Sequence, residues 1–142
     1  MAERTANVTW SGSLMDGAGT IESVGSGAFG PLDVTWGSRA EESEGRTSPE
    51  ELIAAAHAAC FSMALSHGLA QAGSPPDRLE ASATVTFVPG TGITTIALAV
   101  RGSVPGMDAD AFLAAAEAAK ESCPVSKALA AVPEITLDAA LL

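Results

Sequence analysis

The first 36 residues alternate between apolar and polar positions over short stretches that glycine-rich turns separate. A two-residue period is typical of strands that bury one face. We predict a meander of three strands on the apolar positions Val8 and Trp10, Ile21 and Val24, and Leu32, Val34 and Trp36. Residues 37–47 are polar and charged, which predicts a loop.

The pattern then changes to that of a long helix. Ser48 is the predicted N-cap, Pro49 suits the first helical position, and Glu51 would close a capping box. We predict that the helix runs to Gly73, because the Ser-Pro-Pro segment that follows prevents its continuation.

This helix is apolar or small nearly all round, so it presents no polar face to water. A domain of this size can hardly surround such a helix alone. We therefore expect a second copy of the chain to bury it, in an obligate homodimer. Two histidines and several serines argue against a membrane-spanning helix.

Two more strands are predicted over residues 81–88 and 93–104, which alternate well and are joined by a Pro-Gly-Thr-Gly hairpin. Asp108 is the predicted cap of a helix over residues 109–121.

The C-terminal segment is predicted to hold one short helix and one strand. Cys123 precedes a proline and is the predicted N-cap of a helix over residues 125–131. Apolar alternation predicts a closing strand over residues 135–139. The resulting order, βββ-α-ββ-αα-β, predicts a single α+β domain over residues 1–142.

Composition narrows the possible functions. The 142 residues are 47% hydrophobic and 17% charged, which suits one packed domain. Seventeen acidic residues against seven basic ones give a formal net charge of -10, which argues against nucleic acid or an anionic membrane as a partner. The N-terminal segment lacks the apolar stretch of a signal peptide, so we expect a cytoplasmic protein.

The two cysteines are candidate reactive groups. Cys60 lies in the middle of the apolar helix, where the simplest interpretation is a small buried side chain. Cys123 lies at a helix start, where unpaired N–H groups and the helix dipole lower the pKa of a thiol. Paired thiols in a reducing compartment are more often reactive than structural, so a redox pair is a serious hypothesis.

The histidines leave other arrangements open. His57 precedes Cys60 by three residues and shares its helix face, and His67 points the same way further along. This spacing is compatible with a Cys-His nucleophile dyad, or with a metal site formed by His57, Cys60 and Cys123. The simpler interpretation is that the histidines pack at a helix or dimer interface.

Two segments of the chain, SPEELIAAAHAACFSMALS and AKESCPVSKAL, resemble the signature segments of the OsmC (osmotically inducible protein C) family of thiol-dependent hydroperoxide reductases. The predicted element order fits that family over essentially the whole chain. The resemblance implies an intertwined homodimer with its long central helices packed between β-sheets. His57 and Val125 are more typical of the OsmC branch than of the sister Ohr (organic hydroperoxide resistance) branch.

The resemblance also implies roles for individual residues. Cys60 matches the peroxidatic cysteine, Cys123 the resolving cysteine, and Glu50 in PEEL the catalytic glutamate. The family's arginine is best matched by Arg39, predicted at the end of the third strand. Arg46 stays open as an alternative, because the spacing from Arg39 to PEEL is slightly long.

The implied reaction needs no cofactor or metal. An organic hydroperoxide becomes an alcohol, Cys60 becomes a sulfenic acid, Cys123 condenses with it to a disulfide, and an external dithiol, small or protein-bound, restores both thiols. Apolar surroundings of Cys60 favour organic hydroperoxides over hydrogen peroxide. The alternative is a non-catalytic dimer that binds an apolar ligand or senses redox state.

The helix itself separates two of these residues. Glu50 and Cys60 are ten residues apart, or roughly 15 Å along a straight helix. We therefore expect a site composed across the dimer, with Glu50 contributed by the other subunit. Cys60 also needs a nearby cation, because an unperturbed thiol is only a few per cent thiolate at pH 7.

Overall fold

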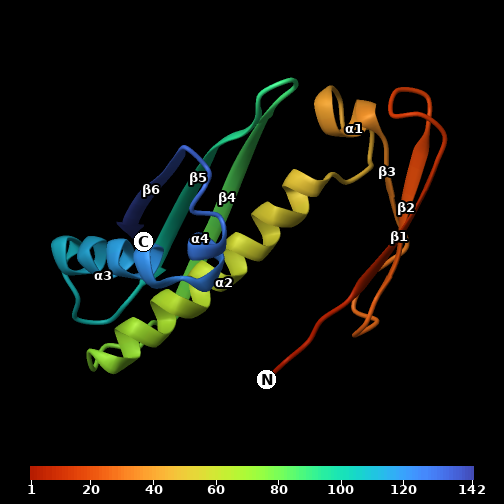
Figure 1. Cartoon of the computed structure of the whole chain (residues 1–142). Coiled ribbons are helices and arrows are strands. Elements are labelled where there is room, and N and C mark those ends of the chain that lie inside the picture. Colours follow the sequence, from red (N-terminus) through yellow and green to blue (C-terminus); the bar gives the residue numbers. More distant parts are fainter. The chain divides into compact units, whose positions relative to one another are not determined.

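A computed structural model describes residues 1–142 and divides them into two compact units, Met1–Leu52 and Ile53–Leu142. Each unit contains one three-stranded sheet (Figure 1). The elements, in chain order, are β1 (Ala6–Ser11), β2 (Ala18–Val24), β3 (Leu32–Val34), α1 (Trp36–Ala40), α2 (Pro49–Gln71), β4 (Arg78–Val88), β5 (Gly92–Ser103), α3 (Ala109–Ser122), α4 (Pro124–Ala128) and β6 (Glu134–Leu141). The α+β prediction is confirmed.

The first unit contains the predicted meander, with β2 between β1 and β3 and both pairs antiparallel. All six residues of β1 are exposed, so none of them is a buried core residue. The Trp10 ring packs against Gly19 in β2 and leaves no room for a side chain there, because an added Cβ would lie 2.6 Å from a ring carbon.

The prediction was wrong just after β3, where a helix replaces the expected strand end and loop. Residues 36–40 form α1, and Thr35 is its N-cap. The Thr35 hydroxyl accepts from the Ser38 amide at 3.0 Å, and the Ser38 hydroxyl accepts from the Thr35 amide at 2.9 Å. This reciprocal cap uses serine where a Glu or Gln is expected, so the sequence signal was easy to miss.

The long helix α2 begins as predicted, and the boundary between the two units falls within it. Ser48 is the cap, since its hydroxyl accepts from the Glu51 amide at 3.1 Å. The Glu51 carboxylate accepts from the Thr47 hydroxyl instead of closing the predicted box. The helix ends before Gly73, whose φ of +85° suits glycine.

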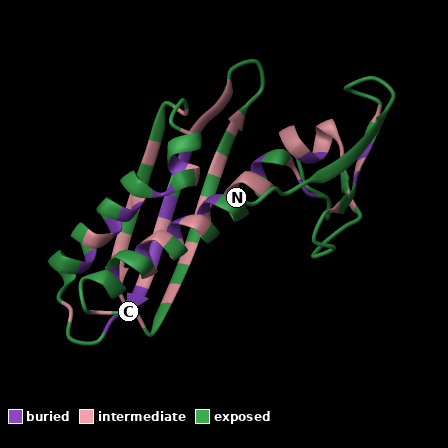
Figure 2. Ribbon diagram, turned by 60° about the horizontal axis from the view of Figure 1, so that its bottom comes forward, coloured by how far each residue is buried: buried purple, intermediate pink, exposed green.

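Opposite faces of α2 differ in exposure. In the second unit one stripe is buried, formed by His57, Phe61, Leu65 and Leu69. The opposite stripe, which carries Ala55, Ala59 and Met63, is exposed, and Met63 is 73% exposed. Figure 2, coloured by burial, shows buried and exposed residues side by side on the helices. By length and composition alone α2 could cross a membrane, but its buried stripe belongs to the core of a folded unit.

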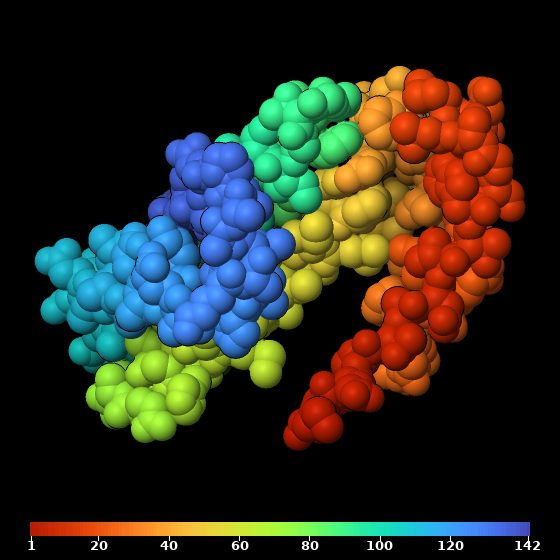
Figure 3. Space-filling view, viewed as in Figure 1, coloured from red at the N-terminus to blue at the C-terminus, as the bar shows by residue number.

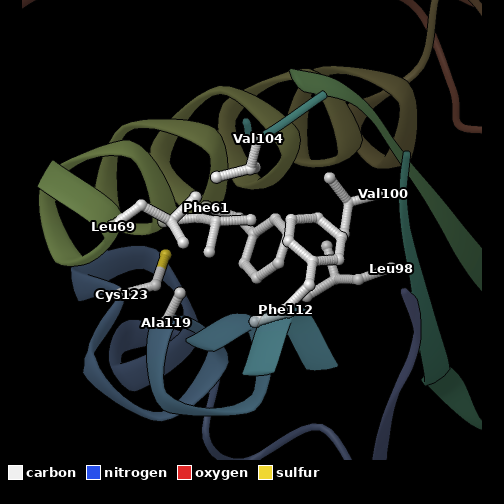
Figure 4. Close-up of a cluster of buried hydrophobic side chains, with 10 residues drawn as sticks. Phe61, Leu69, Leu98, Val100, Val104, Phe112, Ala119 and Cys123 are labelled. Atoms are coloured by element: carbon white, nitrogen blue, oxygen red, sulfur yellow. The ribbon is translucent and has the colours of Figure 1, made fainter. Parts of the chain in front are cut away.

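In the second unit β5 is the central strand, antiparallel to β4 and parallel to β6. The parallel return requires a crossover, which α3 and α4 supply. These two helices cover much of the unit in the space-filling view (Figure 3). Side chains from α2, β5 and α3 form its core (Figure 4), including Phe61, Leu65, Leu98, Val100, Phe112 and Ala116.

Candidate active site

The predicted site residues fall into two groups, one in each unit. In the first unit Arg39 and Glu50 form a close ion pair. The Arg39 Nη2 donates to Glu50 Oε1 at 2.8 Å, and Nε donates to the same carboxylate at 3.0 and 3.2 Å. Glu50 is only 6% exposed, so this two-pronged contact compensates a largely buried charge.

Local structure positions both members of this pair. Arg39 occupies the last turn of α1, not a strand end as predicted, and Glu50 is the second residue of α2. The Ser38 hydroxyl donates to the Thr47 carbonyl at 3.2 Å and thereby ties α1 to the segment that leads into α2. The cap of α1 therefore sets where the guanidinium lies.

Arg46, the alternative arginine, has different surroundings. Its guanidinium contacts Glu44 at 3.4 Å, and both side chains are substantially exposed, at 41% and 74%. Such pairs contribute little to stability. Arg39 is therefore the arginine that the structure brings to Glu50.

A largely apolar pocket of about 400 Å³ lies beside Arg39 in the first unit. Trp10, Leu14, Val34, Thr35, Trp36 and Pro49 line it together with Arg39. A single cation in an apolar surrounding is a combination that ligand sites often show. The sequence interpretation located apolar residues around Cys60 and missed this pocket, because its lining comes from four separate segments.

The two cysteines lie together in the second unit. Both are free thiols, Cys60 half-buried and Cys123 fully buried. Their side chains are hydrogen-bonding neighbours, and the Val125 amide near the start of α4 acts on both sulfurs. Figure 4 shows the Cys123 sulfur pointing toward α2. The side chains of Cys60 and Cys123 are therefore neighbours in this structure.

The environment makes the two thiols differ in acidity. Burial raises the pKa of Cys60, and the neighbouring Cys123 raises it further against the opposing effect of the Val125 amide. Burial also disfavours the Cys123 thiolate, but the Ser126 amide, Cys60 and the Ser126 hydroxyl outweigh it and lower the pKa of Cys123. The sulfur forms no regular N-cap hydrogen bond. Within this unit, Cys123 is the more acidic thiol, as its position at a helix start predicted.

His57 faces Ser126 and not a cysteine. Its Nε2 lies 2.7 Å from the Ser126 Oγ, and both side chains are buried. This contact engages Nε2, and His57 forms no hydrogen bond to either cysteine. No group of three or more His, Cys, Asp or Glu side chains is arranged to hold a metal ion. The sequence interpretation did not single out Ser126, although the spacing of C-P-V-S places it one helical turn after Cys123.

Comparison with known proteins identifies the family. Residues 41–138 match the family of OsmC-like proteins. The chain is also 46% identical over 132 residues to the peroxiredoxin OsmC of Escherichia coli strain K12, covering 91% of this chain and 90% of that one. This chain belongs to the OsmC family. The peroxiredoxin OsmC of Shigella flexneri matches to the same extent.

Solved structures of the OsmC family share the fold. The organic hydroperoxide resistance protein OhrB of Bacillus subtilis is 27% identical, with a TM-score of 0.65 over 97% of this chain and 98% of its own. A Legionella pneumophila protein described as an organic hydroperoxide resistance protein OsmC has a TM-score of 0.66 at 23% identity, over 96% of each chain. The predicted family and its OsmC branch are confirmed, and the chain is a peroxidase of the OsmC type.

Proposed function

We propose that this OsmC-family peroxidase reduces organic hydroperoxides to alcohols through Cys60 and Cys123. The Cys60 thiolate attacks the peroxide, the O–O bond breaks, and the alkoxide takes up a proton, which leaves a Cys60 sulfenic acid. The Cys123 thiol then displaces water to form a Cys60–Cys123 disulfide. An external dithiol, small or protein-bound, reduces this disulfide and is itself oxidised.

The observation that carries this proposal is the pairing of the two sulfurs. Cys60 keeps partial exposure, so a substrate can reach it, whereas Cys123 is shielded from solvent and hence from direct oxidation. A partly exposed thiol beside a second, buried thiol suits an attacking and a resolving role, respectively. No cofactor or metal enters this cycle.

Cys60 needs a cation to become the attacking thiolate, because its surroundings in the second unit raise its pKa. We propose that the Arg39–Glu50 pair of the partner subunit supplies it. On its own α2, Glu50 is roughly 15 Å from Cys60. Arg39 retains 32% side-chain exposure, so its guanidinium can meet an anion besides Glu50.

A homodimer of intertwined chains would complete this site and unite residues 1–142 in one domain. The exposed stripe of α2 supports it, because an alanine-rich helix face with an exposed Met63 is an apolar surface of the kind that marks an interface. Two free cysteines in a working redox pair fit a reducing compartment, so we place the protein in the cytoplasm.

The substrate class follows from the pocket beside Arg39. An alkyl group that enters its apolar lining leaves water at a gain of about 25 cal/mol per Å², and the guanidinium can hold the peroxide oxygens. Hydrogen peroxide has no alkyl group to place there. The strong negative charge of the chain gives nucleic acid and anionic membranes no part in this function.

The competing hypothesis is a non-catalytic dimer that binds an apolar ligand or senses redox state. The deciding experiment mixes the reduced protein with one equivalent of cumene hydroperoxide in a stopped-flow instrument and counts thiols and alcohol. We expect one cumyl alcohol for every two thiols lost. Thiol loss that takes hours, with no further alcohol formed when hydroperoxide and dithiol are both in excess, would instead support a sensor, and binding without thiol loss would support a ligand carrier.

Two variants assign the roles in the same experiment. Cys60→Ser is expected to abolish alcohol formation, because it removes the attacking sulfur. Cys123→Ser is expected to complete one fast turnover and stop at a sulfenic acid, which dimedone traps. The opposite pattern would exchange the two roles.

A further inference from the structure

A buried polar contact behind the cysteines carries a further inference. The His57 Nε2 and the Ser126 Oγ are 2.7 Å apart, although 69 residues separate them in the chain. His57 is 0% exposed, and its other ring nitrogen, Nδ1, has no hydrogen-bond partner. A polar contact this deep in a small core costs desolvation, so it calls for an explanation beyond packing.

The protonation state of His57 follows from these contacts. Burial lowers the pKa of His57, which keeps the ring neutral at pH 7. A proton on Nδ1 would leave a buried N–H donor unpaired, whereas a proton on Nε2 gives that donor an acceptor in Ser126. His57 therefore acts as a neutral donor and not as a base.

The Ser126 hydroxyl has a single proton and, once it accepts from His57, it is free to donate that proton elsewhere. The Ser126 hydroxyl also interacts with the Cys123 sulfur, and the Ser126 hydroxyl and amide both favour its thiolate. We infer that His57 and Ser126 are positioning residues that form a buried hydrogen-bonded chain, His57 to Ser126 to Cys123, which holds the resolving sulfur ready as a thiolate. This inference rests on the proposed resolving role of Cys123.

The hydrogen bonds from His57 to Ser126 and from Ser126 to Cys123 act in both steps that involve Cys123. In the first, the Cys123 thiol loses its proton and its sulfur attacks the sulfenic sulfur of Cys60. The S–S bond forms as the S–O bond breaks, and the departing hydroxide takes up a proton as water. In the second, a reductant thiolate attacks the more exposed Cys60, and Cys123 departs with the electron pair of the S–S bond. A stabilised thiolate is the better leaving group.

Other titratable groups also lie near the hydrogen-bonded side chains of His57, Ser126 and Cys123. Cys60 faces Cys123 from α2 and interacts with it directly. On α3 and α4, Lys120, Glu121 and Lys127 line a pocket of about 290 Å³ that Ser126 also reaches. Each variant in the tests keeps these three side chains, so their effect on the pKa of Cys123 is the same in every protein compared.

The first test measures the acidity of Cys123 alone. In a Cys60→Ser background, thiolate absorbance in the ultraviolet is followed against pH. Ser126→Ala is expected to raise the midpoint by about one pH unit, the effect of losing one hydrogen bond to a charged group, and Ser126→Thr to restore it. Ser122→Ala is the matched control. Ser122 directly precedes Cys123, but its hydroxyl donates to the Ala119 carbonyl and not to the Cys123 sulfur, so the midpoint of Cys123 should not move.

The second test measures the reaction. With both cysteines present, Ser126→Ala is expected to leave sulfenic acid formation by cumene hydroperoxide unchanged and to slow disulfide formation about threefold at pH 7. The difference should vanish at a pH where Cys123 is fully ionised in both proteins. A purely structural role would slow both steps at every pH.

An unchanged Cys123 midpoint in Ser126→Ala overturns the inference. If Ser126→Ala does not fold, His57→Gln, which keeps an N–H donor, is compared with His57→Leu, which has none, and equal midpoints in that pair overturn it as well. The midpoint test does not use peroxide. Failure of the proposed function would therefore appear as missing alcohol with a normal midpoint shift.

Discussion

The arginine is the residue on which the acidity of Cys60 depends. Arg39→Ala is expected to raise the pKa of Cys60, because it removes the cation that favours the thiolate, and therefore to slow hydroperoxide reduction at pH 7 by about tenfold or more. The measurement is the pH dependence of Cys60 alkylation in a Cys123→Ser background, together with single-turnover rates.

Arg46→Ala is the matched control for this prediction. Arg46 is more exposed and pairs only with exposed Glu44, so both the alkylation midpoint and the rate should stay close to those of the unaltered chain. A midpoint that moves only in Arg46→Ala would transfer the activating role to position 46.

The short helix α1 holds Arg39 and therefore affects the site directly. It is only five residues long and depends on the Thr35–Ser38 cap, and its last turn contains Arg39. Thr35→Ala is expected to lower the free energy of unfolding by about 1 kcal/mol, as loss of a cap does, and also to slow hydroperoxide reduction. Urea unfolding and single-turnover kinetics measure the two effects.

The cap of α3 is the control for this prediction, because it is far from Arg39 in the sequence. Its loss should lower stability without changing where the Arg39 side chain lies. Asp108 caps α3, and its carboxylate accepts from the Ala111 amide at 2.8 Å. Asp108→Ala should cost a similar free energy of unfolding and leave the hydroperoxide step unchanged. If both variants slow that step equally, general destabilisation is the cause and α1 has no special part.

The exposed apolar stripe of α2 is the surface at which we expect two copies of the chain to meet. Met63→Glu places a charge on this stripe, and burying an unpaired carboxylate in an interface would cost several kcal/mol. We expect the variant to dissociate at micromolar concentrations where the unaltered chain is dimeric, as sedimentation would show. Peroxidase activity should fall with it, because the site needs both copies.

The control for this variant is Leu113→Glu, which alters an exposed apolar side chain on α3. It should leave the sedimentation coefficient unchanged. A dimer that persists in Met63→Glu, with the activity intact, would contradict the proposed interface.

Substrate preference is a property of the whole assembly, because it needs the pocket beside Arg39 as well as Cys60. A preference on the order of a hundredfold for cumene hydroperoxide over hydrogen peroxide requires only about 2.8 kcal/mol, since 1.4 kcal/mol is tenfold. Burial of an aromatic group in the apolar pocket can supply this. The comparison is kcat/KM for the two peroxides with one dithiol, and a ratio near one would refute it.

Local pattern in the sequence was enough to predict most elements. The alternation in β4 and β5, the Ser48 cap of α2, the Asp108 cap of α3 and the place of Cys123 before α4 all depend on neighbours a few residues apart. The helix α1 escaped prediction because its short cap uses serine at a position where longer acceptors are usual.

The contacts between residues far apart in the chain could be found only in the folded structure. Hydrophobic periodicity specifies which face of an element is buried, but it does not specify against which partner. The parallel pairing of β6 with β5, the contact of Cys60 with Cys123, and the hydrogen bond from His57 to Ser126 each join segments far apart in the chain. The Arg39–Glu50 pair likewise needed a helix that the sequence pattern had not predicted, because only its last turn directs the guanidinium to the start of α2.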